Sequence, residues 1–244
     1  MEPPIDAALS SAPCRSKVPR GARRSRRRGR KIGLLGGSFN PAHEGHRAIS
    51  LEALKRLGLD EVWWLVSPQN PLKPEAGMAP FAERLEQARA VARHPRIRVT
   101  DIEARMGTRY TADTLKRLKT RFPRARFVWL MGADNLLQIS DWKDWTRIFH
   151  AVPVAVFARP TYCLKALAAK AARRFAGNRL RESASRTLAG REPPAWVFVH
   201  NRPYPVSATE IRARRAARMR RKSDEQDGAR PQRPRPDHSG KVTP

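Results

Sequence analysis

The sequence contains few cysteines, few acidic residues for its number of basic ones, and no long hydrophobic segment. Its two cysteines, Cys14 and Cys163, are too few and too far apart for a disulfide framework, so we expect a reducing, cytoplasmic location. Apolar stretches such as 152–158 are far shorter than the roughly 20 residues that cross a bilayer. No apolar segment follows the charges of residues 1–30, which therefore do not resemble a secretory signal.

The excess of basic residues is concentrated at the two ends of the chain. The 244 residues carry a formal net charge of +28, which points to anionic partners without identifying them. About half of this excess lies in the first 31 and the last 32 residues. We therefore expect a basic, disordered leader over residues 1–30, one folded domain over 31–216, and a basic, proline-containing disordered tail over 217–244.

Short apolar runs alternate with amphipathic stretches through this domain. The apolar runs suit buried parallel strands, and the stretches between them repeat apolar residues at helical spacing, as Leu115, Leu118 and Phe122 do. Strand–helix–strand units of this length predict an α/β fold, a doubly wound, Rossmann-like parallel sheet with helices on both faces. The expected strands are 31–36, 61–66, 96–102, 126–132, 153–158 and 196–200, and the clearest helices are 46–58, 80–94 and 111–122.

A glycine- and histidine-containing turn follows the first expected strand, in the stretch GGSFNPAHEGH (36–46). Gly36 and Gly37 allow a sharp turn and a close approach of the backbone to a ligand. A helix that begins near residues 41–43 would direct its free N–H groups and positive dipole end toward the same place. His43 and His46 are three residues apart, so both could reach one anion. The stretch therefore predicts a phosphate-binding turn.

Other interpretations of this stretch are weaker. The glycines match neither the dinucleotide fingerprint nor a Walker A loop, because no Gly-Lys-Ser/Thr follows. A histidine pair could bind zinc, but no cysteine or acid with ligand spacing stands nearby. The remaining alternative is a glycine turn that carries two solvated histidines.

Five ordered motifs resemble one enzyme superfamily. The stretch 36–46 is similar to the G-[ST]-F-D-P-x-H-x-G-H signature of the adenylyltransferase/cytidylyltransferase (HxGH) superfamily, and VSATEIR (206–212) resembles its second motif, I-S-S-T-x-I-R. Between them, RYTADTL (109–115) and MGADNLLQISDW (131–142) are similar to segments of the bacterial nicotinate-nucleotide adenylyltransferase family. SPQNPLKP (67–74) supplies the lysine that this family has after its second strand.

The resemblance implies a site for the phosphates of ATP. His43 and His46 would hold the phosphates, and Arg212 would act as a planar charged clamp, so these three are the expected catalytic residues. Without the motifs around them, Lys73 and Arg212 would be interpreted as solvated surface residues. Only their positions within the motifs favour a role in phosphate binding. The implied ATP and phosphate site comprises Gly37, Ser38, Phe39, Lys73, Ser207, Thr209 and Arg212 beside the histidines.

The resemblance also implies an acceptor pocket for nicotinate mononucleotide, lined by Tyr110, Thr111, Asp134 and Trp142. The indole of Trp142 would stack on the pyridine ring. The alternative for Trp142 is a place in a helix core together with Trp145. Asp134 follows the strand 126–132, and a carboxylate at the carboxyl end of a strand is well placed for a ligand.

Two residues depart from the superfamily pattern. Asn40 stands where the signature has an acid, which removes a charge but keeps a hydrogen-bonding side chain. Ala208 replaces a serine of the second motif, so one hydroxyl contact is missing. Neither change affects the histidines, Thr209 or Arg212.

The implied reaction is adenylyl transfer from Mg-ATP to nicotinate mononucleotide, which yields deamido-NAD and pyrophosphate in NAD biosynthesis. Mg²⁺ would arrive with ATP, and no protein metal site is expected. Two rivals stay open: a sister transferase that uses phosphopantetheine or nicotinamide mononucleotide, and a nucleic-acid binder that acts through the basic runs 23–30 and 212–222. Because those runs lack interleaved aromatics, we expect nucleic-acid contact only through the tails, and no membrane partner.

Overall fold

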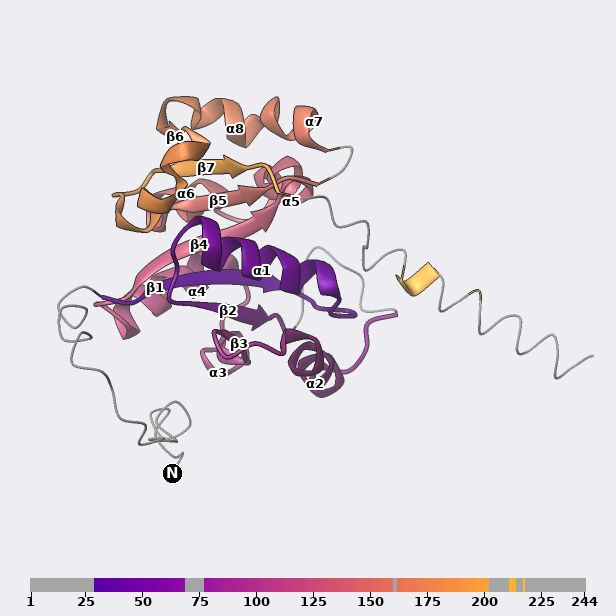
Figure 1. Cartoon of the computed structure of the whole chain (residues 1–244). Helices are drawn as coiled ribbons and strands as arrows, with labels where there is room; N and C mark the ends of the chain where they lie inside the picture. The colour runs from indigo at the N-terminus through magenta and orange to yellow at the C-terminus, as the bar shows by residue number, and fades with distance from the viewer. Residues whose placement is uncertain (1–28, 69–76, 160–161, 202–210, 214–216, 218–244) are drawn as a thin grey trace, which may run out of the picture.

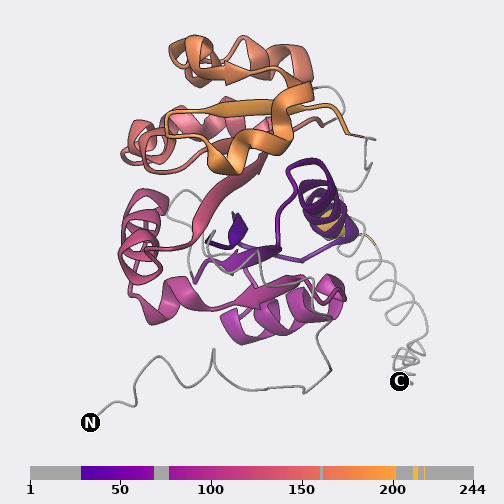
Figure 2. The same ribbon diagram turned by 60° about the vertical axis from the view of Figure 1, so that its left-hand side comes forward.

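The computed structural model describes residues 29–68, 77–159, 162–201, 211–213 and 217. Within them, seven parallel strands form one sheet in the order β3-β2-β1-β4-β5-β7-β6, with helices on both faces (Figures 1 and 2). This architecture confirms the predicted doubly wound α/β fold. The strands are β1 (Lys31–Gly37), β2 (Glu61–Val66), β3 (Ile97–Thr100), β4 (Arg126–Gly132), β5 (Val154–Phe157), β6 (Arg179–Leu180) and β7 (Trp196–Val199).

Helices fill the connections between the strands. The three expected from apolar spacing are present with small shifts at their ends, and the others are short. The helices are α1 (Glu44–Arg56), α2 (Phe81–Ala92), α3 (Ile102–Arg105), α4 (Thr111–Arg121), α5 (Ala133–Gln138), α6 (Trp145–Ala151), α7 (Cys163–Leu167) and α8 (Lys170–Arg174), with 3₁₀ turns η2 (Ile139–Asp141), η3 (Ala176–Asn178) and η4 (Glu182–Gly190).

Alternate side chains of the central strands enter two hydrophobic cores, one on each face of the sheet. Leu34 of β1 packs in the core covered by α3 to α8, whereas Leu35 packs in the core covered by α1, α2 and η4. The buried residues of α4, Leu115 and Leu118, lie in the first of these cores, and Phe122 packs at its edge. Burial on both faces explains why the strand sequences are continuously apolar.

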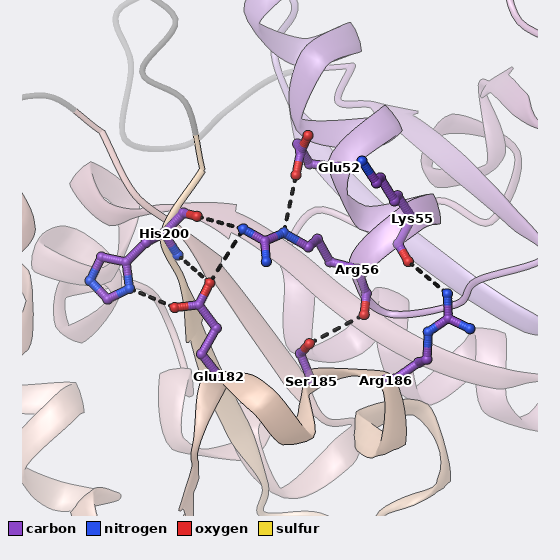
Figure 3. A network of polar contacts seen from close by, with 7 residues as sticks. All are labelled: Glu52, Lys55, Arg56, Glu182, Ser185, Arg186 and His200. Carbon is purple, nitrogen blue, oxygen red and sulfur yellow. Dashed lines mark hydrogen bonds and ion pairs between the residues drawn. The ribbon is translucent and has the colours of Figure 1, made fainter.

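The C-terminal turn of α1 is tied to the end of β7 and to η4 (Figure 3). Arg56 donates a hydrogen bond to the carbonyl oxygen of His200 at 2.9 Å. Glu182 Oε1 accepts one from the backbone N–H of His200 at 3.0 Å. The second Glu182 oxygen lies 2.7 Å from His200 Nδ1. Ser185 completes the connection by donating to the Arg56 carbonyl at 3.2 Å. These contacts hold His200, the first residue after β7, against α1 and η4.

Within the described part of the chain, no helix combines the length and the apolar character that a membrane span requires. The predicted leader and tail lie almost wholly outside the described residues, so their boundaries stay a prediction. Cys163 lies at the start of α7 as a half-buried free thiol.

Candidate active site

The first motif and the segment that contains Asp134 lie where the winding of the sheet reverses. From β1 the chain proceeds to β2 and β3 on one side, and then to β4 and β5 on the other, so the reversal lies between β1 and β4. The first motif follows β1, and Asp134 follows β4. In open α/β sheets, ligands bind outside the carboxyl ends of the strands at such a reversal.

The turn after β1 is made at Phe39. Gly36 and Gly37 are the last residues of β1, and neither has a positive φ, whereas Phe39 has a φ of 47°. Gly36 is required for packing, because a Cβ there would lie 2.4 Å from the Trp129 ring. The sharp turn thus comes two residues later than the glycines suggest. The buried Phe39 ring is held by stacking on Trp64, with ring centroids 5.1 Å apart.

The two histidines cap helix α1 and lie against each other. His43 is the N-cap, and its Nδ1 accepts a hydrogen bond from the Gly45 N–H at 3.1 Å. His46 Nδ1 in turn accepts from the His43 N–H at 3.2 Å, and the two ring centroids are 3.9 Å apart. A neutral ring whose Nδ1 accepts a hydrogen bond carries its proton on Nε2. The helix cap therefore makes both Nε2–H groups donors, and the contact between the rings places the two histidines side by side.

Burial and a nearby arginine keep His43 uncharged. The side chain is buried, and this burial, together with the positive charge of Arg159, lowers its pKa from 6.5 to about 4. His43 is therefore a neutral hydrogen-bond donor at pH 7. Arg159 follows β5 and was not among the sequence-predicted residues, although its position at the carboxyl end of a strand was a signal that could have identified it.

Asp134 connects the β4 end of the site to Arg159. Its Oδ2 accepts an ion-paired hydrogen bond from Arg159 at 3.2 Å. Its Oδ1 is buried and has no hydrogen-bond partner among the described residues. A buried polar oxygen without a partner is costly, and such atoms often mark a ligand contact. A Cβ at Gly132 would lie 2.4 Å from this oxygen, so any larger residue there would displace the carboxylate of Asp134.

The second motif is described only at its end. Arg212 Nη1 donates to the backbone carbonyl of Asn40 at 2.7 Å, which places Arg212 beside the first motif. Ser207, Thr209 and Ala208 lie outside the described residues, as does Lys73. The Asn40 side chain accepts from Ala79 N–H at 3.3 Å and donates to the Gly77 carbonyl at 3.1 Å. The amide that replaces the expected acid thus holds the turn to the segment before α2.

Two parts of the predicted acceptor pocket, the start of α4 and the segment that contains Trp142, lie near each other. Tyr110 is the N-cap of α4, and Thr111 begins that helix. The ammonium group of Lys143, the residue after Trp142, lies 4.4 Å from the centroid of the Tyr110 ring. This contact places the Trp142 segment beside the start of α4. Trp142 is half-buried and packs at the edge of the core beneath α4.

Glu103 is a buried carboxyl group under the loop that leads to Tyr110. Its Oε1 lies 3.3 Å from Thr114 Oγ1, which also lies 2.9 Å from Thr108 Oγ1 and 3.2 Å from the Tyr110 carbonyl oxygen. Burial raises the pKa of Glu103 from 4.5 to about 7, against the opposing effect of hydrogen bonds from Thr114 and Ser67. Sequence reasoning missed this residue, because nothing local distinguishes a buried glutamate from an exposed one.

A cavity of about 1090 Å³ extends from Tyr110 along α4, between this helix and β3. It is lined on one side by Thr100, Asp101 and Ile102 and on the other by α4, and its arginines and Lys116 make it cationic. Among the described residues, no three histidine, cysteine or acidic side chains form a group that could hold a metal ion.

Comparison with known proteins identifies related enzymes. The cytidylyltransferase-like family profile matches residues 34–214. A relative from Ruegeria pomeroyi, named "probable nicotinate-nucleotide adenylyltransferase", is 54% identical over 187 residues, which cover 77% of this chain and 87% of the relative. A relative of the same name from Parvibaculum lavamentivorans is 54% identical over 186 residues, covering 76% and 92%.

The fold is also similar to that of a solved structure. The Plasmodium falciparum nicotinic acid mononucleotide adenylyltransferase complexed with NaAD has a TM-score of 0.57 and 16% sequence identity. The similarity covers 75% of this chain and 83% of that one. At this identity the match supports the nucleotidyltransferase fold.

Proposed function

The chain belongs to the cytidylyltransferase-like family and, within it, to the nicotinate-nucleotide adenylyltransferases, and from this we propose that it transfers the adenylyl group of ATP to nicotinate mononucleotide. The products are the deamido form of NAD and pyrophosphate, and the reaction is a step of NAD biosynthesis. The observation that carries the proposal is the capped histidine pair at the sheet reversal, within a chain 54% identical to named relatives.

The reaction needs positioning and charge stabilisation more than a base. The 5′-phosphate oxygen of the mononucleotide is already anionic at neutral pH, so it attacks the α-phosphorus without losing a proton to the protein. Negative charge grows on the bridging oxygen as pyrophosphate leaves, and preorganised donors stabilise it. The Nε2–H groups of His43 and His46 serve as such donors, because both Nδ1 atoms accept from the backbone.

Three further cations would act on the phosphates. Arg212 lies against the turn through Asn40, which supports its role as a clamp for the β- and γ-phosphates. Arg159 is held by Asp134, and its charge acts on His43, so it adds a positive group that sequence reasoning did not include. Lys73, with Ser207 and Thr209, would complete the site from segments outside the described residues. Mg²⁺ enters with ATP and neutralises part of the triphosphate charge.

The acceptor would lie on the β4 side of the site. Tyr110 and Thr111 at the start of α4, with Trp142 nearby, would enclose the pyridine ring. The buried Oδ1 of Asp134, which has no partner among the described residues, would accept a hydrogen bond from a ribose hydroxyl. The stacking would be mainly a binding contribution, since it is present in both the ground state and the transition state.

An acceptor panel tests this proposal. The protein is incubated with Mg-ATP and, separately, with nicotinate mononucleotide, nicotinamide mononucleotide and phosphopantetheine, and pyrophosphate release is followed. We expect the highest kcat/KM for nicotinate mononucleotide. A higher value for either other acceptor would identify a sister transferase, and no release with any of them would contradict adenylyl transfer.

A further inference from the structure

Arg84 is an arginine buried without a carboxylate partner. It lies in the first turn of α2, and only 1% of its surface is exposed. In the described part of the chain, no acidic side chain lies within ion-pair distance of its guanidinium group. Arginine is almost never fully buried unless it is paired, so its contacts require an explanation.

The guanidinium group of Arg84 binds four backbone carbonyl oxygens. Its Nε donates to Ala79 at 2.9 Å, its Nη1 donates to both Ser38 and Ser67 at 2.7 Å, and its Nη2 donates to Pro68 at 2.7 Å. These bonds use four of its five N–H groups. Hydrogen bonds from an ionised donor are about twice as strong as neutral ones, which offsets the cost of burying the charge.

The four carbonyls belong to segments that carry the site. Ser38 is the first residue after β1, in the turn that leads to the histidines, and Ser67 and Pro68 are the first residues after β2. The two strands are neighbours, and Ser67 N–H donates to the Gly37 carbonyl at 2.9 Å. Arg84 therefore joins the carboxyl ends of β1 and β2, just beyond the last paired residues of the two strands.

The bond to Ser38 also fixes the direction of the next amide. The Ser38–Phe39 peptide is trans, so its C=O and N–H point in opposite directions. With the Ser38 carbonyl directed at Arg84, the Phe39 N–H points away from α2. Among the described residues, none accepts a hydrogen bond from this N–H. The Phe39 ring stacks on Trp64, and its centroid lies 4.7 Å from the His46 ring centroid. These contacts restrain Phe39, and Arg84 restrains Ser38, so both residues of the peptide are held.

We propose that Arg84 is a positioning residue for adenylyl transfer, which fixes the Ser38–Phe39 peptide so that the Phe39 N–H donates to a phosphate oxygen of ATP beside the histidines. This inference rests on the proposed function. Arg84 touches no substrate atom, and it acts through the backbone it holds. Lysine cannot replace it, because three donors on one nitrogen cannot span carbonyls of three separate segments.

Two substitutions and a matched control test the role. Arg84→Met removes every donor but keeps a long side chain, and Arg84→Lys keeps the charge. A misplaced reacting group costs on the order of 100-fold, so we expect kcat to fall about 10- to 100-fold in both variants and KM for ATP to rise, with KM for the mononucleotide within about twofold. Arg124→Met and Arg124→Lys, at an exposed position before the amino end of β4, should leave all three values unchanged.

The outcomes separate a positioning role from a structural one. Rates are measured well below the melting temperature and per folded protein. A lower melting temperature with near-native kcat, or recovery of native kcat in Arg84→Lys, would overturn the inference. So would equal changes in both KM values. The wild type is assayed first, and its failure to form the dinucleotide would contradict the proposed function itself and, with it, this role.

A second measurement uses the wild-type chain and does not depend on the variants folding. The protein is labelled with ¹⁵N-phenylalanine, which gives eight amide signals, and the Phe39 signal is identified by its loss in Phe39→Leu. On saturation with Mg²⁺ and a non-hydrolysable ATP analogue, the Phe39 amide proton should shift downfield, as a new hydrogen bond to an anion requires. An unshifted Phe39 signal with a saturated site would overturn the proposal.

Discussion

Replacing Glu103 by glutamine should change how the stability of the protein depends on pH. Burial raises the pKa of Glu103 from 4.5 to about 7, so between these values the folded state binds a proton that the unfolded state has released. The free energy of unfolding therefore falls as pH rises from about 4.5 to about 7, by about 3 kcal/mol at 1.36 kcal/mol per pH unit. Glutamine keeps the size of the side chain and carries no charge at any pH, so the Glu103→Gln variant lacks this loss.

The contacts of Thr114 do not require a charge at position 103. Thr114 Oγ1 donates to Glu103 Oε1 at 3.3 Å and lies 2.9 Å from Thr108 Oγ1 and 3.2 Å from the Tyr110 carbonyl oxygen. The side-chain amide oxygen of glutamine can accept the same hydrogen bond from Thr114. We therefore expect the Glu103→Gln variant to fold.

Urea unfolding at pH 5, 6, 7 and 8, followed by circular dichroism, measures the effect. We expect similar stability of wild type and Glu103→Gln at pH 5, and a variant more stable by up to about 3 kcal/mol at pH 8. His43, whose pKa is lowered to about 4, acts in the opposite direction between about pH 4 and 6.5, but it is common to both proteins and cancels in the difference. Glu86→Gln, at an exposed position of α2, is the control. A difference between wild type and Glu103→Gln that stays constant from pH 5 to 8 would refute the reasoning.

Three further predictions concern the site and the ends of the chain. His46→Ala removes a preorganised donor and should lower kcat by roughly 10²- to 10³-fold with a milder effect on ATP binding, whereas near-native kcat would remove His46 from the mechanism. Trp142→Ala should mainly raise KM for nicotinate mononucleotide, by the equivalent of about 1–3 kcal/mol; equal damage to both substrates with a lower melting temperature would assign the indole to the core. A chain of residues 30–216 should retain turnover and lose any salt-dependent affinity for nucleic acid, and loss of turnover in a folded truncation would show that an end serves the site.

The sheet could be predicted because its central strands are buried on both faces. The apolar runs of β1, β2 and β4 match the expected ranges closely, because only the first residue of each strand is charged and the rest are apolar or glycine. The strand β6 (Arg179–Leu180) was missed because two residues carry no periodicity. The short helices α5 to α8 were missed for a similar reason, because they are specified by packing on the sheet rather than by a long amphipathic pattern.

The candidate site was predicted from its motifs but not from its supporting contacts. The histidine pair could be located because the residues that form it are close in sequence, and the same is true of Tyr110 and Thr111. Arg84 could not be distinguished by sequence alone among 50 lysines and arginines, whereas Arg159 follows a strand and carried a positional signal that the motifs do not include. Their roles depend on carbonyl and carboxylate partners up to 46 positions away in the chain. Glu103 was missed for a different reason, because its partner Thr114 is only 11 positions away but the raised pKa arises from burial, which no local pattern reveals.

The transfer of isotopic label from ATP tests the central claim most directly. The protein is incubated with Mg²⁺, nicotinate mononucleotide and ATP labelled with ³²P at either the α- or the γ-phosphorus, and the dinucleotide and pyrophosphate are separated. Attack of the mononucleotide phosphate on the α-phosphorus predicts that the α-label appears only in the dinucleotide and the γ-label only in pyrophosphate. A γ-label in the mononucleotide product, or no labelled dinucleotide at all, would contradict adenylyl transfer by this chain.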